Sequence, residues 1–344
     1  MRNKEIVKNT LLLDGNGNLK QKGFAKSLIL DYKKDMIKTK KSRIKEWDYY
    51  LVYNKEIALC FTIDDNTYMG LTSVSVIDFK NKKEKTTSLI KFFTGGKTNL
   101  PESSKEGDVE VKNKKISIAF FNDGKTRNIK VTMPKFYKDM KFSCDLTLTE
   151  EPNESLVIVT PFEKDKHFYY NQKIIGMVAE GIFTIGDKKF QFDKQDTRAL
   201  LDWGRGVWTY KNTWYWGALC TNVDGHEVGF NIGYGFGDTT QASENAIFYD
   251  GVMHKLDDVV FNIPKNKKGK DDFLSDWTFT SSDGRFEMDF KPIIDRAADT
   301  NVLILRSNQH QVFGLFTGYF ILDDGTKVEI KNEIGFAEKV FNKW

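Results

Sequence analysis

Residues 201–217 combine charged side chains with a dense group of large rings. Asp202 and Arg205 occur there beside four of the chain's seven tryptophans, which are Trp203, Trp208, Trp214 and Trp216. A carboxyl group kept protonated by apolar surroundings can act as a general acid, and indole faces stabilise a transient cation by roughly 0.5 to 2 kcal/mol per contact. Arg205 would orient the acid or bind a ligand carboxylate. The segment therefore predicts Asp202 and Arg205 as catalytic residues, with the tryptophans as ligand contacts.

The same residues fit a structural interpretation equally well. Tryptophans at this spacing also form the core of a β-barrel, and Asp202 and Arg205 would then make a structural ion pair. The sequence alone favours neither interpretation.

The segment Glu227–Gly237 has one nearly bare face. From Val228 onward apolar side chains occupy every second position, and the positions between them are glycines apart from Asn231. Such a strand leaves room for a ligand or permits a sharp barrel bend, and we favour the bend. Asn231 and Tyr234 remain candidate ligand contacts, together with Tyr170 and Tyr210.

A second charged cluster lies at Arg43–Tyr50, where basic and aromatic residues alternate with a face that contains Glu46 and Asp48. Clusters of this kind more often form a salt-bridged strand edge than a site, and we interpret this one as such an edge.

Alternation of apolar and polar residues is the dominant pattern of the chain. In Phe142–Thr149 every second residue is apolar, as a half-buried strand requires. Asp-Gly pairs such as Asp224-Gly225 separate many of these segments and are typical of tight hairpins. Only residues 31–46 could hold a helical turn or two. We therefore expect an all-β fold of barrels or sandwiches.

The length of 344 residues favours two domains. Strand patterns occur in both halves, and the polar segment Pro161–His167 could be a linker between them. We place the boundary near residue 165, which gives an N-terminal β domain over residues 1–165 and a C-terminal β domain over residues 166–344.

Charge and composition exclude several classes of partner. The net charge of +4 arises from 52 basic and 48 acidic residues spread along the chain, so no nucleic acid is expected. The lysine-rich run Lys33–Lys45 is most simply a solvated face, with peripheral contact to an anionic membrane surface as the alternative. No segment approaches the ~18 apolar residues of a transmembrane span. The oligomeric state cannot be derived from these patterns.

Cysteine usage and motif spacing point to a cytoplasmic protein without a cofactor. Cys60, Cys144 and Cys220 are far apart and odd in number, as reduced core residues are. A phosphate-binding loop would need glycine where Lys91 stands, and the four histidines show no metal-binding spacing. We therefore expect neither a nucleotide cofactor nor a metal.

Five segments carry a resemblance to a known family. The chain resembles the uncharacterised bacterial family called domain of unknown function 2804 in RIKEWDYY (Arg43–Tyr50), FYYNQKI (Phe168–Ile174), LDWGRGVWTYKNTWYWG (Leu201–Gly217), FNIGYGFGD (Phe230–Asp238) and GFAEKVFNKW (Gly335–Trp344). The resemblance covers essentially the whole chain, but that family name implies no activity.

A more distant similarity suggests a fold and a type of ligand. Residues 176–193 followed by LDWGRGVW resemble the AttH-like, carotenoid 1,2-hydratase and tocopherol-cyclase-like superfamily. The resemblance implies two lipocalin-like, calycin-like antiparallel β-barrels packed together, with little helix. It also implies apolar ligands, handled in several relatives by cofactor-free acid or pericyclic chemistry, and it assigns an acid role to Asp202.

Our leading hypothesis is a pocket at the domain junction for a lipid, isoprenoid or polyketide-like molecule. Hydratase, isomerase or cyclase chemistry would use Asp202 as the acid. A non-catalytic carrier with the same pocket is the alternative, and a carbohydrate-binding module is a weaker one. Deeply enclosed rings would favour the first two, whereas an exposed flat platform of rings would favour the third.

Overall fold

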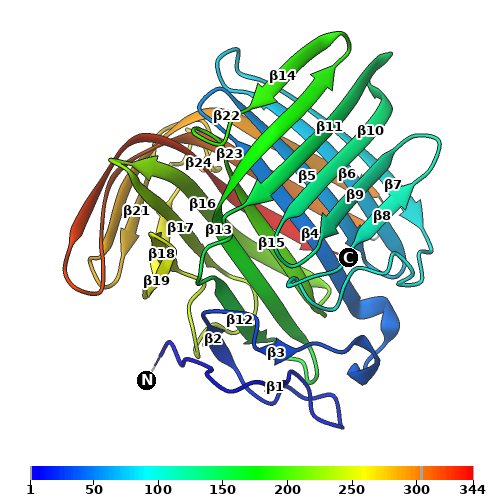
Figure 1. Cartoon of the computed structure of the whole chain (residues 1–344). Helices are drawn as coiled ribbons and strands as arrows, with labels where there is room; N and C mark the ends of the chain where they lie inside the picture. The colour runs from blue at the N-terminus through cyan, green and yellow to red at the C-terminus, as the bar shows by residue number, and fades with distance from the viewer. Residues whose placement is uncertain (1, 303–304, 344) are drawn as a thin grey trace.

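Two curled antiparallel β-sheets make up nearly all of the computed structural model (Figure 1). It describes residues 2–302 and 305–343, so Met1 and Trp344, the outer ends of the two expected domains, lie outside the described residues. Within that range the helices are two short 3-10 turns, η1 (Lys34–Met36) and η2 (Lys41–Arg43). The expected all-β class is confirmed, and residues 31–46 hold the helical turns.

The first sheet curls around its own hydrophobic core. Its main path, in spatial order, is β7 (Lys83–Phe92), β6 (Met69–Asp78), β5 (Ile57–Asp65), β4 (Ile44–Tyr53), β15 (Arg198–Val207), β13 (Phe168–Ile185), β11 (Met140–Thr149), β10 (Arg127–Tyr137), β9 (Ser117–Asn122) and β8 (Val109–Lys112). Three shorter strands complete it: β12 (Leu156–Pro161), β14 (Lys188–Phe192) and β2 (Gly23–Ala25). Separately, β1 (Thr10–Leu11) pairs in parallel with β3 (Leu30–Asp31).

The second sheet has a simpler order. Its strands are β19 (Val252–Lys255), β18 (Ala246–Tyr249), β17 (His226–Tyr234), β16 (Lys211–Val223), β24 (Lys327–Lys343), β23 (Leu305–Ile321), β22 (Phe286–Val302), β21 (Trp277–Ser281) and β20 (Val259–Asn262). Asp224 and Gly225, which join β16 to β17, have φ values of 53° and 90°. Positive φ at both positions is what a two-residue hairpin turn needs.

The chain changes sheet between β15 and β16. Strands β13 and β15 pair with each other, and β15 also pairs with β4 in the first sheet. The expected boundary near residue 165 lies between β12 and β13. These two strands pair with one another, so the boundary falls inside the first sheet. The crossing to the second sheet comes between Val207 and Lys211.

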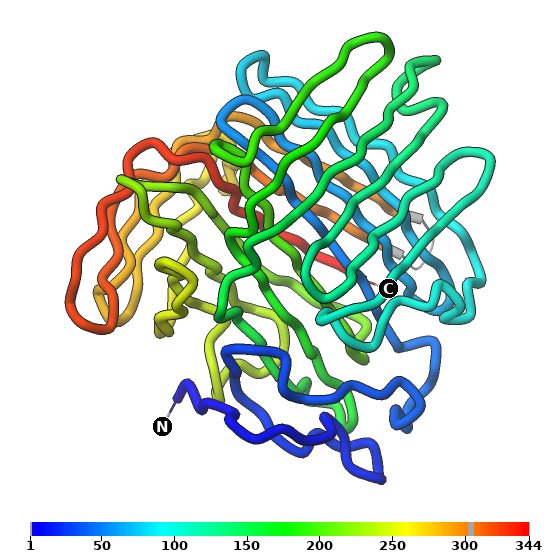
Figure 2. The backbone as a smooth tube through the Cα atoms, in the orientation of Figure 1, coloured from blue at the N-terminus to red at the C-terminus, as the bar shows by residue number. Residues whose placement is uncertain are grey.

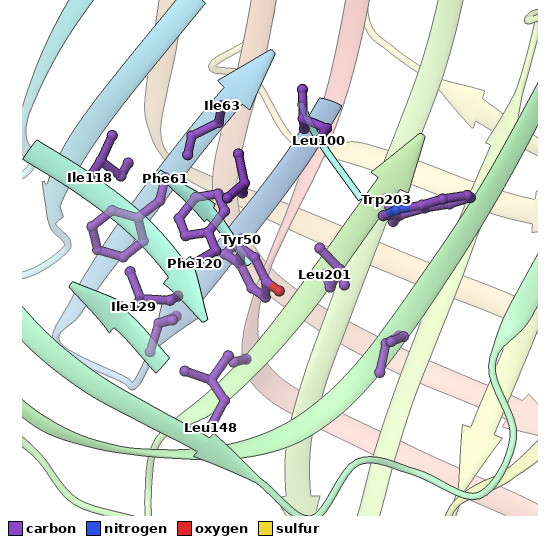
Figure 3. Packing of buried hydrophobic residues seen from close by; sticks show 14 of the residues in the cluster. Tyr50, Phe61, Ile63, Leu100, Ile118, Phe120, Ile129, Leu148, Leu201 and Trp203 are labelled. Carbon is purple, nitrogen blue, oxygen red and sulfur yellow. The ribbon is translucent and has the colours of Figure 1, made fainter. Parts of the chain in front are cut away.

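Three hydrophobic cores hold the molecule together. One fills the curl of the first sheet, and Figure 3 shows part of it, with Tyr50, Phe61, Phe120 and Trp203 packed among aliphatic side chains. Another fills the second sheet. The third lies between the sheets, where the long strands of the second sheet, orange and red in Figure 2, run behind blue and cyan strands of the first. Contacts of β13 with β16 and β17 support this packing.

Several smaller expectations can be compared with the structure. Cys60, Cys144 and Cys220 are buried and free. In the lysine-rich run, Lys33 pairs with Glu102 at 3.0 Å, and Lys34 pairs with the buried Glu46. No helix among residues 2–302 and 305–343 is long and apolar enough to cross a membrane.

Candidate functional site

A registered row of mostly polar side chains crosses the outer face of the first sheet. Each residue of this row lies directly opposite the next on the neighbouring strand, and all line a space that faces the second sheet. From β13 to β7 the row is Lys173, Asp202, Tyr49, Thr62, Ser73 and Ser88. Six adjacent strands therefore present one band of hydrogen-bonding groups.

The second sheet presents a matching row. From β22 to β16 it consists of Arg296, Gln311, Glu338 and Trp216, again in direct register. The two rows touch where the Tyr49 hydroxyl and the Gln311 side-chain amide lie 3.3 to 3.4 Å apart. They also meet where the Lys173 ammonium lies over the Trp216 ring. Beside these contacts lies a space that we call the intersheet cavity.

The intersheet cavity has a volume of about 270 Å³, close to the lower end of the ~300–1,000 Å³ typical of small-molecule sites. Its apolar wall consists of rings from both sheets and the connection between them: Trp47, Tyr169, Trp208, Trp214 and Phe236. Trp47 stacks on Tyr169 with 5.8 Å between ring centres, and Trp208 meets Trp47 edge-on at 4.8 Å. One part of the cavity is thus aromatic and another is lined by hydroxyl groups.

Asp202 accepts hydrogen bonds from three neighbours. Lys173 Nζ lies 2.8 Å from Asp202 Oδ1, Asn171 Nδ2 donates to the same oxygen, and Trp47 Nε1 donates to Oδ2 at 3.2 Å. The side chains of Lys173 and Asp202 are only 4% and 10% exposed. These donors occupy acceptor positions on both carboxyl oxygens, so Asp202 is better placed to orient its neighbours than to donate a proton to a ligand.

Gly204 makes this arrangement sterically feasible. It lies opposite Trp47 on β4, and a Cβ at residue 204 would come within 1.9 Å of the Trp47 ring. Without a side chain there, the indole lies over β15 and reaches Asp202.

Lys173 joins the ion pair to the aromatic wall. Its ammonium lies 3.9 Å from the ring centre of Trp216, a favourable cation–π position. Trp216 is itself held by a 2.7 Å hydrogen bond from Nε1 to Asn231 Oδ1. The ammonium is therefore positioned by Asp202 on one side and by the indole face on the other.

Three further carboxyl groups lie at the cavity wall, those of Asp64, Glu244 and Glu338. Burial raises the pKa of Glu338 to about 7, although hydrogen bonding from Trp214 and the charge of Lys173 oppose the shift. Trp214 Nε1 donates to Glu338 Oε1 at 2.9 Å, and Gln311 Nε2 donates to Oε2 at 3.1 Å. Burial likewise raises the pKa of Glu244 to about 7. Groups with such values can donate and accept protons near neutral pH.

The structure brings together only part of the predicted set. Asp202, Trp208, Trp214, Trp216 and Tyr234 line the intersheet cavity. Asn231 does not line it, but its side-chain amide holds Trp216 and donates to the backbone oxygen of Glu244 at 2.7 Å.

Arg205, Trp203 and Tyr170 lie on the opposite side of the first sheet. Arg205 pairs with Asp48 at 2.9 Å and stacks on Trp203 at 4.4 Å, so the expected pair with Asp202 does not form. Tyr170 packs edge-on against Trp203 in the first core. These three side chains cannot reach a ligand in the intersheet cavity, because residues at odd spacing point to opposite faces of a strand.

Tyr210 and the glycine-rich strand also differ from expectation. Tyr210 lies beside Arg43 and Lys343 and does not line the cavity. A Cβ at Gly229 would come within 2.7 Å of Ile175 on β13, so at this position the bare face of β17 permits close contact with the first sheet. Residues 44–50 of the second charged cluster lie in β4, which is a central strand with ion pairs and not an edge, and Arg43 ends η2.

Several site residues were not predicted from the sequence. They are Trp47, Tyr49, Tyr169, Lys173, Phe236, Glu244, Arg296, Gln311 and Glu338. Most lie in the five segments that carry the family resemblance, each of which contributes to the cavity wall. That shared location is the signal that could have found them. No group of three or more His, Cys, Asp or Glu side chains in the described part of the chain is arranged to hold a metal ion.

Comparison with known proteins gives the family. The family model described as domain of unknown function (DUF2804) matches residues 3–344. The chain belongs to this family. The resemblance noted in the sequence is thereby confirmed, and no curated protein matches the chain.

One of two similar solved structures confirms the fold class. An AttH-like protein from Nitrosomonas europaea superposes with a TM-score of 0.55 at 12% identity, covering 90% of this chain and 96% of that one. Kievitone hydratase from Nectria haematococca aligns with a TM-score of 0.46 at 9% identity, over 87% of this chain and 88% of that one. The first match confirms two packed lipocalin-like β-barrel domains, and at this identity it establishes the fold alone.

Proposed function

We propose that this DUF2804 protein binds a hydrophobic, ring-containing small molecule of the isoprenoid or polyketide type in the intersheet cavity. The observation that carries the proposal is the composition of the cavity wall. Indoles from both sheets enclose one part of it, and the buried pair Lys173–Asp202 lies beside them. Trp208 and Trp216 are each only 7% exposed, which favours an enclosed ligand over a sugar stacked on a flat surface.

We further propose that bound ligand undergoes cofactor-free hydration or isomerisation. In hydration, protonated Glu338 or Glu244 would give its proton to an alkene carbon, water would add to the resulting cation, and the proton lost by that water would return to a carboxylate. One water is consumed and no electrons are exchanged. Buried acids with pKa values of about 7 support this chemistry, and the indole faces would stabilise the cation.

A non-catalytic carrier is the second candidate. Two observations favour a carrier. Three donors hold the Asp202 carboxyl group in place, and Glu338 already accepts two hydrogen bonds from the protein. A carrier needs such rigid, fully bonded walls, whereas an acid must release its proton to the ligand.

Ligand extraction and tryptophan fluorescence test the binding proposal. Native mass spectrometry of purified protein would identify bound molecules, and a panel of isoprenoids and polyketide-like phenols should quench Trp emission at micromolar concentration, about −8 kcal/mol of binding. Trp208→Phe should remove part of the quenching. Trp277→Phe is the matched control, because Trp277 is fully buried in the core of the second sheet. A panel without any quenching would refute the pocket.

Glu338→Gln then separates enzyme from carrier. The amide preserves the size of the side chain but cannot donate a proton, so an enzyme using Glu338 should keep ligand affinity within about tenfold, roughly 1.4 kcal/mol, and lose product formation. Product is read as a gain of one water in mass or as an isomer with altered retention. If wild-type protein binds the ligand and never converts it, the chain is a carrier.

A further inference from the structure

Arg296 on β22 lines the intersheet cavity and forms no ion pair with a carboxylate among the described residues, although the charges of Glu338 and Glu84 act on it from a distance. Its guanidinium donates one hydrogen bond, from Nη1 to Gln311 Oε1 at 2.5 Å. Gln311 in turn donates to Glu338, so the amide separates the guanidinium from that acid. The remaining N–H groups of Arg296 have no acceptor in the described part of the chain.

Arg296 is partly buried, whereas the three fully buried arginines each pair with a carboxylate. Arg205 pairs with Asp48 at 2.9 Å, Arg198 with Glu227 at 2.6 Å, and Arg127 with Glu151 at 2.8 Å. The cavity's second cation, Lys173, pairs with Asp202. An unpaired guanidinium in a partly enclosed site is unfavourable unless something compensates its charge. Arg296 therefore stands out as a cation with an unfilled partner position.

The surface that shares this part of the cavity suits an oxyanion. Thr62, Ser73, Thr86 and Ser88 contribute hydroxyl groups from strands β5 to β7, and β22 contacts β7 directly. Ser88 Oγ donates to Ser73 Oγ at 3.1 Å, which leaves hydroxyl hydrogen-bonding capacity for a ligand. A guanidinium with neighbouring hydroxyls is a common arrangement for carboxylate, sulfonate or phosphate oxygens.

We propose that the intersheet cavity takes an amphipathic organic anion, with its oxyanion on Arg296 and its planar ring system against the tryptophans. This inference rests on the proposed binding function and specifies its ligand class. The anionic group would anchor the molecule at the hydroxyl-lined end. The rings would then lie beside Trp208 and Trp214, within reach of the wall that contains Glu338.

Two fluorescent probes that share one ring system test the proposal. 8-Anilinonaphthalene-1-sulfonate carries a sulfonate, and N-phenyl-1-naphthylamine is the same molecule without it. We expect wild-type protein to bind the sulfonate at least about tenfold more tightly than the neutral amine, measured by fluorescence titration at slightly acidic pH and low salt. Equal affinities would overturn the proposal, and this comparison does not depend on any variant.

Variants locate the anion site. Arg296→Gln should abolish the preference for the sulfonate and leave binding of the amine unchanged, and Arg296→Lys should keep part of the preference because it retains the charge. Arg306→Gln is the matched control, since Arg306 is an exposed arginine on the neighbouring strand β23. A preference that survives in folded Arg296→Gln, or is lost equally in Arg306→Gln, would refute the assignment to Arg296.

The two levels of proposal fail in different ways. If the amine binds and quenches Trp emission but the sulfonate is not preferred, the hydrophobic pocket stands and the anion site is refuted. If neither probe binds wild-type protein, the proposed binding function and the anion site both fail. Far-UV circular dichroism and thermal unfolding of each variant show whether it is folded.

Discussion

Replacing Asp202 by Asn would leave the Lys173 ammonium, with a side chain only 4% exposed, without the carboxylate 2.8 Å away. Removing one partner of a buried ion pair costs about 3 to 5 kcal/mol. We expect about 3 kcal/mol, the lower end, because Glu244 and Glu338 also interact electrostatically with Lys173 and can take up the negative charge. The new amide NH2 group at residue 202 would also face donors that the Asp202 carboxylate accepts from in the wild-type protein, so one donor would meet another donor.

Urea unfolding of a double-mutant cycle measures this pair directly. Asp202→Asn and Lys173→Met should each destabilise the protein, and the double variant should be less destabilised than the sum by about 2 kcal/mol, because it contains neither unpaired charge. Asp145→Asn is the control, since Asp145 and its partner Lys130 are 63% and 54% exposed. A coupling energy below about 0.5 kcal/mol would show that the reasoning about burial is mistaken.

Two further predictions concern packing and pH. Gly204→Ala should destabilise the protein by about 1 to 3 kcal/mol and displace Trp47, because its Cβ would lie 1.9 Å from that ring; Gly15→Ala, with open space around it, is the control, and equal urea midpoints for both would contradict the steric argument. Burial raises the pKa of Glu338 from 4.5 to about 7. Between these two pH values the folded protein therefore keeps the Glu338 carboxyl protonated, whereas the unfolded chain has released that proton. The free energy of unfolding should therefore fall as pH rises from about 4.5 to about 7, and Glu338→Gln should reduce that fall; an unchanged pH profile would argue against a protonated Glu338.

The strand content was predictable because period-two alternation is a local property. Phe142–Thr149 was predicted as a half-buried strand and forms most of β11, with Phe142, Leu146 and Leu148 buried. The turn at Asp224-Gly225 was equally local, since few residue pairs adopt positive φ at two successive positions. The position of the sheet change was not local. It depends on long-range pairing of β15 with β4 across about 150 residues of chain.

The alternation rule, applied within the tryptophan segment itself, would have divided it correctly. Asp202 and Arg205 are three residues apart, and residues at odd spacing on one strand point to opposite faces. The same parity separates Asp202 from Trp203, which packs in the first core. Treating residues 201–217 as one cluster therefore merged two environments. Trp214 and Trp216, at even spacing on β16, do share the cavity face.

The remaining site residues depend on how the two sheets pack, which no single segment encodes. Arg296, Gln311 and Glu338 become neighbours only through the register of β22, β23 and β24. They meet Tyr49 and Asp202 only because the sheets face each other. Burying two registered polar rows against each other is costly compared with apolar packing. Most of the core between the sheets consists of apolar side chains, including Leu51, Phe313 and Phe336. The two registered polar rows border the intersheet cavity, as the proposed ligand-binding role requires of its wall.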